Sequence, residues 1–230
     1  MYTRQKAYAG LSMELEVRAR TREGKLHREK RQNPTPEAMR NYNDKMAEKN
    51  LRMLIGTNFG KGCGHFVLTY DGETPDIHTA KEKIVGNFVE RLRRRLKKQG
   101  KELKYIIVTE YEAKRIHHHM ILNTLDLEMV TDVWKEGFVR VTPLDRSGDY
   151  RRLAHYLIKE TKRTFRKYGG KRWSPSRNLE KPKFEKPKEI KRWNVNKPPR
   201  EYKGYRLIDW EVTVNPVTGF LHQFAYYLKN

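Results

Sequence analysis

Three consecutive histidines stand near the middle of this chain, in the run Ile116-His117-His118-His119-Met120. Their apolar neighbours predict a β-strand over 116–122, in which successive side chains point to alternate faces. His117 and His119 then share one face, and His118 points to the other. Two neutral imidazoles on one face make half of a metal site, although a basic, partly exposed strand would also account for them.

A carboxylate precedes the histidines on a second predicted strand, over 105–110. The short polar segment 112–115 predicts an antiparallel hairpin, in which Glu110 reaches the face of the paired histidines. Two imidazoles and one carboxylate suit Mn²⁺ or Mg²⁺ with positions left open for phosphate and water. Glu112 shares the face of Glu110 and competes for the role, but we prefer Glu110 because Glu112 is expected in the turn.

A tyrosine on a helix predicted over 149–165 is the candidate nucleophile. Tyr156 and Lys159 stand three residues apart and share a helix face, and Arg152 and Arg163 lie along the same helix. Because neighbouring cations make a phenol easier to deprotonate, Tyr156 is the candidate nucleophile and Lys159 its partner. The alternative is that Tyr156 packs in the core, as most helical tyrosines do.

Strands and helices around these residues predict the fold. The strands are expected over 65–70, 105–110, 116–122 and 138–142, and the helices over 36–54, 79–100, 127–135 and 149–165. This order predicts an α+β fold with a central antiparallel sheet flanked by helices. The helix over 36–54 is expected on the outside of the core.

Composition divides the chain into three parts. Residues 1–34 are polar and charged without clear periodicity, and we expect a basic, loosely ordered arm. Residues 35–165 hold the predicted core. Residues 166–230 begin as a basic, proline-rich tract and end in a predicted hairpin over about 206–227, which we expect to pack on the core.

The charge of the chain points to a partner rich in phosphate. Lys and Arg number 50 against 28 Asp and Glu, so that the formal net charge is +22. The single cysteine excludes an intrachain disulfide and a thiolate zinc cluster. An apolar signal region and a long apolar run are both lacking, so we expect a cytoplasmic protein that does not enter a membrane.

The motifs taken together resemble the HUH endonucleases, and among them the single-tyrosine replication initiators of the phage and plasmid replication-associated branch. Residues 66–70 resemble the family's first motif, residues 110–119 its metal motif, and residues 156–159 its nucleophile motif, in the family's order. His118 departs from the pattern, which has an apolar residue between the two histidines.

The resemblance implies the HUH/Rep nuclease fold, of ferredoxin or RRM-like type, for residues 35–165. It also implies initiation of rolling-circle replication: Mn²⁺ or Mg²⁺ bound by Glu110, His117 and His119, and attack by Tyr156 to give a 5′-phosphotyrosine. The residues expected to contact DNA are Thr69, Tyr70, Arg152, Arg163 and Arg177.

The implied partner is single-stranded or hairpin DNA at a replication origin. Because the sequence has no Gly-x-x-x-x-Gly-Lys-Ser/Thr phosphate loop, a separate helicase is expected to unwind the DNA. A relaxase-like or transposase-like enzyme of the same chemistry is the near alternative. A non-catalytic nucleic-acid-binding protein is the alternative from another class.

Overall fold

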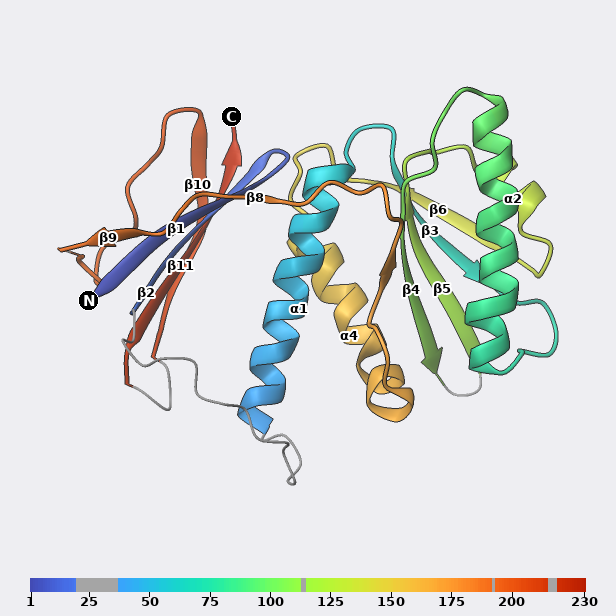
Figure 1. The fold of residues 1–230 in the computed structure, drawn as a ribbon, viewed down its shortest axis with the longest axis horizontal. Helices are drawn as coiled ribbons and strands as arrows, with labels where there is room; N and C mark the ends of the chain where they lie inside the picture. The colour runs from blue at the N-terminus through green and yellow to red at the C-terminus, as the bar shows by residue number, and fades with distance from the viewer. Residues whose placement is uncertain (20–36, 113–114, 192, 215–218) are drawn as a thin grey trace.

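A computed structural model of the chain describes residues 1–19, 37–112, 115–191, 193–214 and 219–230. Within these ranges the chain forms two antiparallel sheets with helices against them, which confirms the predicted α+β class. Figure 1 shows two helices, α1 and α4, between the sheets, and α2 on the outer face of one sheet. The prediction of one central sheet therefore missed a second one.

The sheet that carries the three histidines, the histidine sheet, has the strand order β6-β3-β5-β4-β7. Its strands are β3 (Gly64–Thr69), β4 (Tyr105–Glu112), β5 (Arg115–Leu122), β6 (Val139–Pro143) and β7 (Ser174–Pro175). Strands β4 and β5 pair as the predicted hairpin, and Glu110 stands opposite His117. Strand β3 pairs with the other side of β5 and sets Val67 opposite His119.

Helices cover both faces of the histidine sheet. They are α1 (Glu37–Asn58), the π-helical turn η1 (Thr79–Ile84), α2 (Val85–Lys98), α3 (Leu127–Val133) and α4 (Arg151–Tyr168). Phe88 and Leu92 from the apolar stripe of α2 pack with Phe66 and Trp134 on the outer face. On the inner face Leu157 of α4 packs with residues of α1, β4 and β5.

Two helices begin without the cap that their sequence suggests. Thr79-Ala80-Lys81-Glu82 has the spacing of a capping box, but the carboxylate of Asp76 accepts the backbone N–H groups of His78 and Thr79 instead. Asp149 precedes α4 and is of a residue type that caps helices, but the helix has Tyr150 as its N-cap, without a side-chain cap hydrogen bond. Asp149 instead accepts hydrogen bonds from the backbone and the guanidinium of Arg151.

The second sheet, the terminal sheet, joins the two ends of the described chain. Its strands are β1 (Tyr2–Ala9), β2 (Ser12–Ala19), β8 (Lys183–Phe184), β9 (Lys188–Ile190), β10 (Tyr205–Val214) and β11 (Leu221–Lys229). Strand β11 pairs with β2, so the predicted C-terminal hairpin extends the N-terminal hairpin. The expected loose arm is thus wrong for residues 2–19, and residues 20–34 lie outside the described part.

Helix α1 is sandwiched between the sheets, and its predicted position outside the core is wrong. Leu51 and Ile55 are fully buried toward the histidine sheet, and Met53 packs against Ala7 and Ala9 of the terminal sheet. Near the start of α1, Met39 and Tyr42 are exposed, so the helix is buried on two sides only over its later turns. Its side toward β2 is polar, because Lys49 and Arg52 pair there with Glu16 and Glu14.

The turn between β1 and β2 approaches α1 very closely. Gly10 has a φ of 60°, and a Cβ there would lie 2.0 Å from the carbonyl oxygen of Gly56. A Cβ on Gly56 would in turn lie 2.8 Å from the carbonyl oxygen of Ala9. Both glycines are therefore required by the contact between hairpin and helix.

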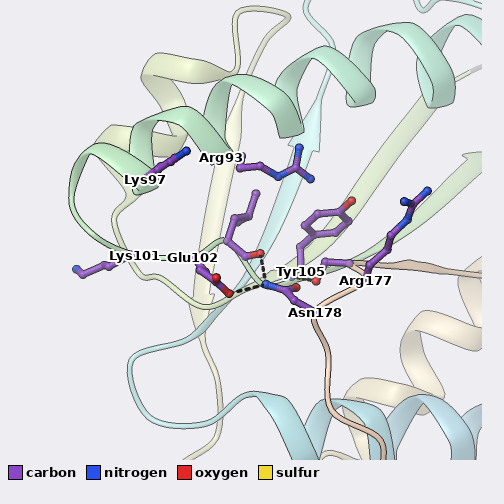
Figure 2. A pocket seen from close by; sticks show the side chains of 9 residues that line it. Arg93, Lys97, Lys101, Glu102, Tyr105, Arg177 and Asn178 are labelled. Carbon is purple, nitrogen blue, oxygen red and sulfur yellow. Dashed lines mark hydrogen bonds between the residues drawn. The ribbon is translucent and has the colours of Figure 1, made fainter.

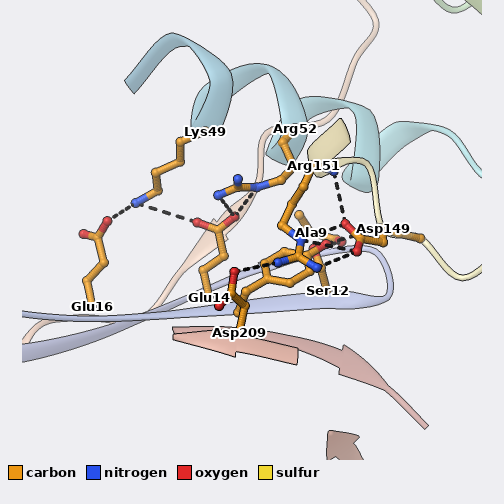
Figure 3. A network of polar contacts seen from close by, with 11 residues as sticks. Ala9, Ser12, Glu14, Glu16, Lys49, Arg52, Asp149, Arg151 and Asp209 are labelled. Carbon is orange, nitrogen blue, oxygen red and sulfur yellow. Dashed lines mark hydrogen bonds and ion pairs between the residues drawn. The ribbon is translucent and has the colours of Figure 1, made fainter. Parts of the chain in front are cut away.

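Ion pairs between the terminal sheet and the helices reinforce this contact (Figure 3). Glu14 is buried and accepts a hydrogen bond from Arg52 Nε, at 2.8 Å. Nη2 of Arg52 forms an ion pair with the same carboxylate oxygen at 2.6 Å. Glu16 pairs with Lys49 at 2.5 Å. At the start of α4, Arg151 pairs with Asp209 of β10 at 3.0 Å.

The basic, proline-rich tract from residue 166 onward links the two sheets. It adds β7 to the edge of the histidine sheet, beside β4, and then β8 and β9 to the edge of the terminal sheet, beside β1. The tract therefore holds the sheets together from the side, which its composition alone did not indicate. None of the helices in the described ranges is both long and apolar enough to cross a membrane.

Candidate active site

Glu110, His117 and His119 meet on the inner face of the histidine sheet, which faces α4. The Oε2 atom of Glu110 lies 3.2 Å from Nε2 of His119 and 4.0 Å from Nδ1 of His117. Glu110 and His119 are buried, whereas the side chain of His117 is 37% exposed. The register of the hairpin thus brings the three predicted residues together, with His117 at the solvent side.

His65 from β3 completes the cluster, and the sequence reasoning did not select it. Its Nε2 lies 3.2 Å from Nδ1 of His119, and the two rings stack with centroids 5.3 Å apart. Burial, followed by the proximity of His119, lowers the pKa of His65 to about 4, so it is neutral at pH 7. His65 therefore fixes the ring of His119 from the side opposite Glu110.

Tyr156 of α4 lies over this cluster and is not a core residue. Its side chain is 42% exposed, and its ring stands at 90° to the ring of His119, with centroids 5.4 Å apart. The ring of His65 is 6.4 Å away in a similar edge-on arrangement. The packing alternative is thereby excluded for Tyr156, whose neighbours Leu157 and Ile158 fill the core instead.

The electrostatics around Tyr156 differ from the prediction. Burial, then the charges of Glu160 and Glu110, raise the pKa of Tyr156 above its ordinary value. We expected Lys159 and the arginines of α4 to lower it, but Lys159 and Arg152 are exposed. The charges that act on the pKa of the Tyr156 phenol are therefore those of carboxylates.

Glu110 keeps its charge in this setting. Burial alone would raise its pKa, but hydrogen bonds with His119 and Glu160 and the nearby imidazoles outweigh burial, so that the pKa is lowered. Glu160 lies four residues after Tyr156 on α4 and therefore on the same helix face. That spacing was the available sequence signal for Glu160, which the prediction overlooked.

His118 points away from the site, as the strand alternation predicts. It is fully buried on the outer face, where the hydroxyl of Tyr70 lies 2.9 Å from Nε2 and that of Thr109 lies 3.0 Å from Nδ1. The ring packs edge-on against Trp134. Burial, followed by the charge of His119, lowers the pKa of His118 to about 3, so it serves as a neutral core residue.

The donor chemistry of the cluster fits a divalent cation. If Nδ1 of His119 donates to His65, then Nε2 of His119 and the Glu110 carboxylate face each other as two acceptors at 3.2 Å. Two facing acceptors need a proton or a metal ion between them. Ligands about 2.1 Å from one ion lie roughly 3–4 Å apart, as these atoms do.

These side chains do not form a complete set of metal ligands as they are placed. Within the described ranges, no group of three or more His, Cys, Asp and Glu side chains is arranged to hold a metal ion. His117 is the open member of the set, because it is exposed and its nearest ring nitrogen is 4.0 Å from Glu110. His117 would have to turn inward to join Glu110 and His119 as a third ligand of a cation.

The residues predicted to contact DNA lie in different places. Tyr70 directs its hydroxyl to His118 in the outer core, and the carbonyl of Thr69 accepts a hydrogen bond from the Trp134 indole. Arg152 and Arg177 are exposed, the first on α4 and the second beyond β7. The side chains of Arg163 and of the rival ligand Glu112 lie outside the described part of the structure.

Comparison with known proteins supports the resemblance read from the motifs. Residues 65–164 match a family of replication-associated proteins of the ORF2 type, and the matched segment holds His65, Glu110, the three histidines and Tyr156. This match supports a replication initiator of the rolling-circle type. Searches of curated proteins and of solved structures gave no match.

Proposed function

We propose, from the premise that residues 65–164 are a replication-associated domain of the ORF2 type, that this protein nicks single-stranded DNA and keeps the cut end bound. The observation that carries the proposal is the position of Tyr156, an exposed phenol whose ring stands on His119 next to Glu110. In this proposal the bond cut is the one between a backbone phosphorus and its 3′ oxygen.

Each residue of the cluster has a role in this reaction. Glu110, His119 and, after turning inward, His117 would hold Mn²⁺ or Mg²⁺, and His65 would keep His119 oriented. A bound divalent cation supplies charge neutralisation for the phosphate oxygens. Lys159, exposed one turn after Tyr156, would hold a phosphate of the incoming strand.

In the covalent step one bond forms, one bond breaks and the phenol loses its proton. The Tyr156 oxygen forms a bond to phosphorus, and the 3′ oxygen of the DNA leaves. The phenol proton passes to a nearby base, for which Glu160 is the candidate because Glu110 would hold the metal ion, and the leaving oxygen takes up a proton from solvent. The products are a 5′-phosphotyrosine and a free 3′-hydroxyl, and because the bond energy is kept, rejoining needs no ATP.

The same proposal includes an origin in single-stranded or hairpin form and a separate helicase. The sequence contains no nucleotide-binding phosphate loop that would drive unwinding. A cytoplasmic setting would bring the protein to both partners.

The test is formation of a covalent adduct. The protein is incubated with a labelled single-stranded oligonucleotide that carries a candidate origin, with Mn²⁺ or with EDTA, and separated on a denaturing protein gel. We expect a metal-dependent adduct that Tyr156→Phe abolishes. Tyr168→Phe is the matched control, because Tyr168 ends the same helix and is 41% exposed, against 42% for Tyr156.

Two results would count against the proposal. An adduct that survives in Tyr156→Phe places the nucleophile elsewhere. Tight binding of single-stranded DNA without any adduct, on every origin tested, favours the non-catalytic binding protein.

A further inference from the structure

A basic groove lies on the opposite side of the histidine sheet from Tyr156. It runs between the last turns of α2 and the segment that follows β7, and has a volume of about 810 Å³. Its basic lining residues are Arg93 and Lys97 of α2, Lys101 of the next loop and Arg177 of the segment after β7 (Figure 2). Its volume is within the range of pockets that bind small organic groups, roughly 300–1,000 Å³.

The groove combines positive charge with an aromatic side chain. Its lining holds four cations and one carboxylate, Glu102, which gives a net charge of 4 − 1 = +3. Tyr105, the first residue of β4, is half-buried, and Figure 2 shows its ring between the side chains of Arg93 and Arg177. Phosphate-binding cations around an available aromatic ring are the usual means of binding unpaired nucleotides.

The walls of the groove are held in place by hydrogen bonds. Asn178 donates to the carbonyl of Leu103, at 3.2 Å, and to the carboxylate of Glu102, at 3.3 Å. Ser176 accepts the backbone N–H of Tyr105 and returns its own N–H to the carbonyl of Tyr105. Glu102 is thus engaged with Asn178, and the segment that carries Arg177 is anchored beside the ring of Tyr105.

The groove is separate from the candidate active site. Tyr105 and Glu110 lie five residues apart on β4, which is about 17 Å, and an odd spacing turns their side chains to opposite faces of the sheet. Tyr105 packs against the outer core with α2, whereas Glu110 faces α4. One DNA strand reaches both places only if it extends beyond the nicking site.

We propose that this groove binds single-stranded DNA outside the nicking site, with phosphates on Arg93, Lys97, Lys101 and Arg177 and one unpaired base on the ring of Tyr105. The inference rests on the proposed function for the identity of the nucleic acid. Base stacking on Tyr105 requires an unpaired base, which distinguishes a single strand from a duplex. The groove would thus hold the strand that flanks the nick.

The test measures binding without cleavage. Fluorescence anisotropy in EDTA gives the affinity of the full chain for a labelled single strand of about 30 nucleotides over a range of salt concentrations. The variant Arg93→Ala/Lys97→Ala should bind more weakly, and the slope of log K against log salt should fall by about 0.7 for each lost phosphate contact, about 1.4 in total.

A control variant with the same loss of charge comes from the same helix. Arg91→Ala/Lys98→Ala removes one exposed arginine and one exposed lysine of α2 that do not line the groove. It should change the slope by less than half as much. Equal changes in the two double variants would overturn the proposal, because the helix would then act only through its overall charge.

Tyr105 is tested by two substitutions. Tyr105→Leu keeps an apolar side chain against the outer core but removes stacking, so it should weaken single-strand binding roughly 5-fold or more. Tyr105→Phe should bind like the wild type. Wild-type affinity in Tyr105→Leu, or an equal loss for a duplex of the same length, would overturn the proposal.

These binding results are independent of the adduct experiment. If the groove variants lose affinity and the wild type forms no adduct, the proposal that the groove binds single-stranded DNA is supported and the nicking proposal is contradicted. If an adduct forms but the groove variants bind like the control, the nicking proposal is supported and the groove proposal is contradicted.

Discussion

Substitution of Arg52 tests whether the N-terminal hairpin is docked on α1. Arg52 donates a hydrogen bond to and forms an ion pair with Glu14, whose side chain is only 1% exposed, and the two residues lie on different elements. Removal of one partner of a buried ion pair costs about 3–5 kcal/mol, because the other charge is left buried without its partner. Lys49, 3.9 Å from Glu14, offsets part of that cost, so we expect about 3 kcal/mol for Arg52→Ala.

The cost should depend on pH in a defined direction. Burial raises the pKa of Glu14, and Arg52 and Lys49 offset only part of that effect. Without Arg52 the pKa of Glu14 in the folded state rises further above its unfolded value. When the folded pKa of a carboxyl group lies above its unfolded pKa, the free energy of unfolding falls as the pH rises through the folded pKa. The cost of Arg52→Ala should therefore be largest at neutral pH and smaller near pH 4.

Chemical and thermal denaturation followed by circular dichroism measure this cost. For a chain of this length, about 3 kcal/mol corresponds to a fall in Tm of roughly 6–12 °C. Arg40→Ala is the control, because Arg40 is an exposed arginine on the same helix. Adding Glu14→Gln to Arg52→Ala removes the unpaired charge and should recover part of the loss.

A cost of less than about 0.5 kcal/mol for Arg52→Ala, which is typical of a surface substitution, would contradict this prediction. That result would mean that Glu14 is hydrated, and that residues 2–19 do not pack on α1. A cost that grows toward low pH would show that the charge of Glu14 is not the cause.

Three further predictions concern other parts of the molecule. Gly56→Ala should lower the Tm, because the added Cβ would lie 2.8 Å from the carbonyl oxygen of Ala9. This cost outweighs the preference of alanine over glycine in a helix, about 1 kcal/mol. A higher Tm would contradict the close contact. Burial raises the pKa of Tyr226 to about 12, so unfolding followed by circular dichroism should show stability falling as the pH rises from about 10 to 12, and less steeply in Tyr226→Phe. Calorimetric titration with Mn²⁺ should show binding lost in His119→Gln but kept in His118→Gln, and loss in both would assign a ligand role to His118.

The part of the site that lies on one hairpin was predictable from the sequence. Alternation along β5 separated His118 from His117 and His119, and a short loop placed Glu110 opposite His117. These relations depend on neighbours within a dozen residues. Once the hydrogen-bonded register of the hairpin is set, it fixes which side chains lie opposite one another.

His65 escaped prediction because its role depends on a distant pairing. It lies 54 residues before His119, and only the pairing of β3 with β5 brings the two rings together. The signal was its place in β3, two residues before Val67, which stands opposite His119. Nothing in the local sequence around His65 specifies that register.

The terminal sheet was missed for the same physical reason, on a larger scale. Residues 12–18 pair with residues 222–228, and the face of β2 toward α1 carries Glu14 and Glu16 rather than apolar side chains. The alternation of Met13, Leu15 and Val17 with Glu14 and Glu16 was the local signal for this strand, and the prediction overlooked it. The pairing with β11 could not be predicted from neighbouring residues. The polar face of β2 is stabilised by cations of α1, whose positions follow only from the fold.

The error about Tyr156 concerns charge and has a direct consequence for the mechanism. Helix spacing correctly placed Lys159 near Tyr156, but Glu160 and Glu110 contribute more to the pKa of the phenol than the exposed lysine does. A DNA phosphate that approached these carboxylates would be repelled, and loss of the phenol proton would be disfavoured. In the proposed function, a divalent cation at Glu110 would supply the positive charge that lets a strand bind there. The adduct is therefore expected to require such a cation. The cations of the proposed basic groove would add to the affinity for the same strand.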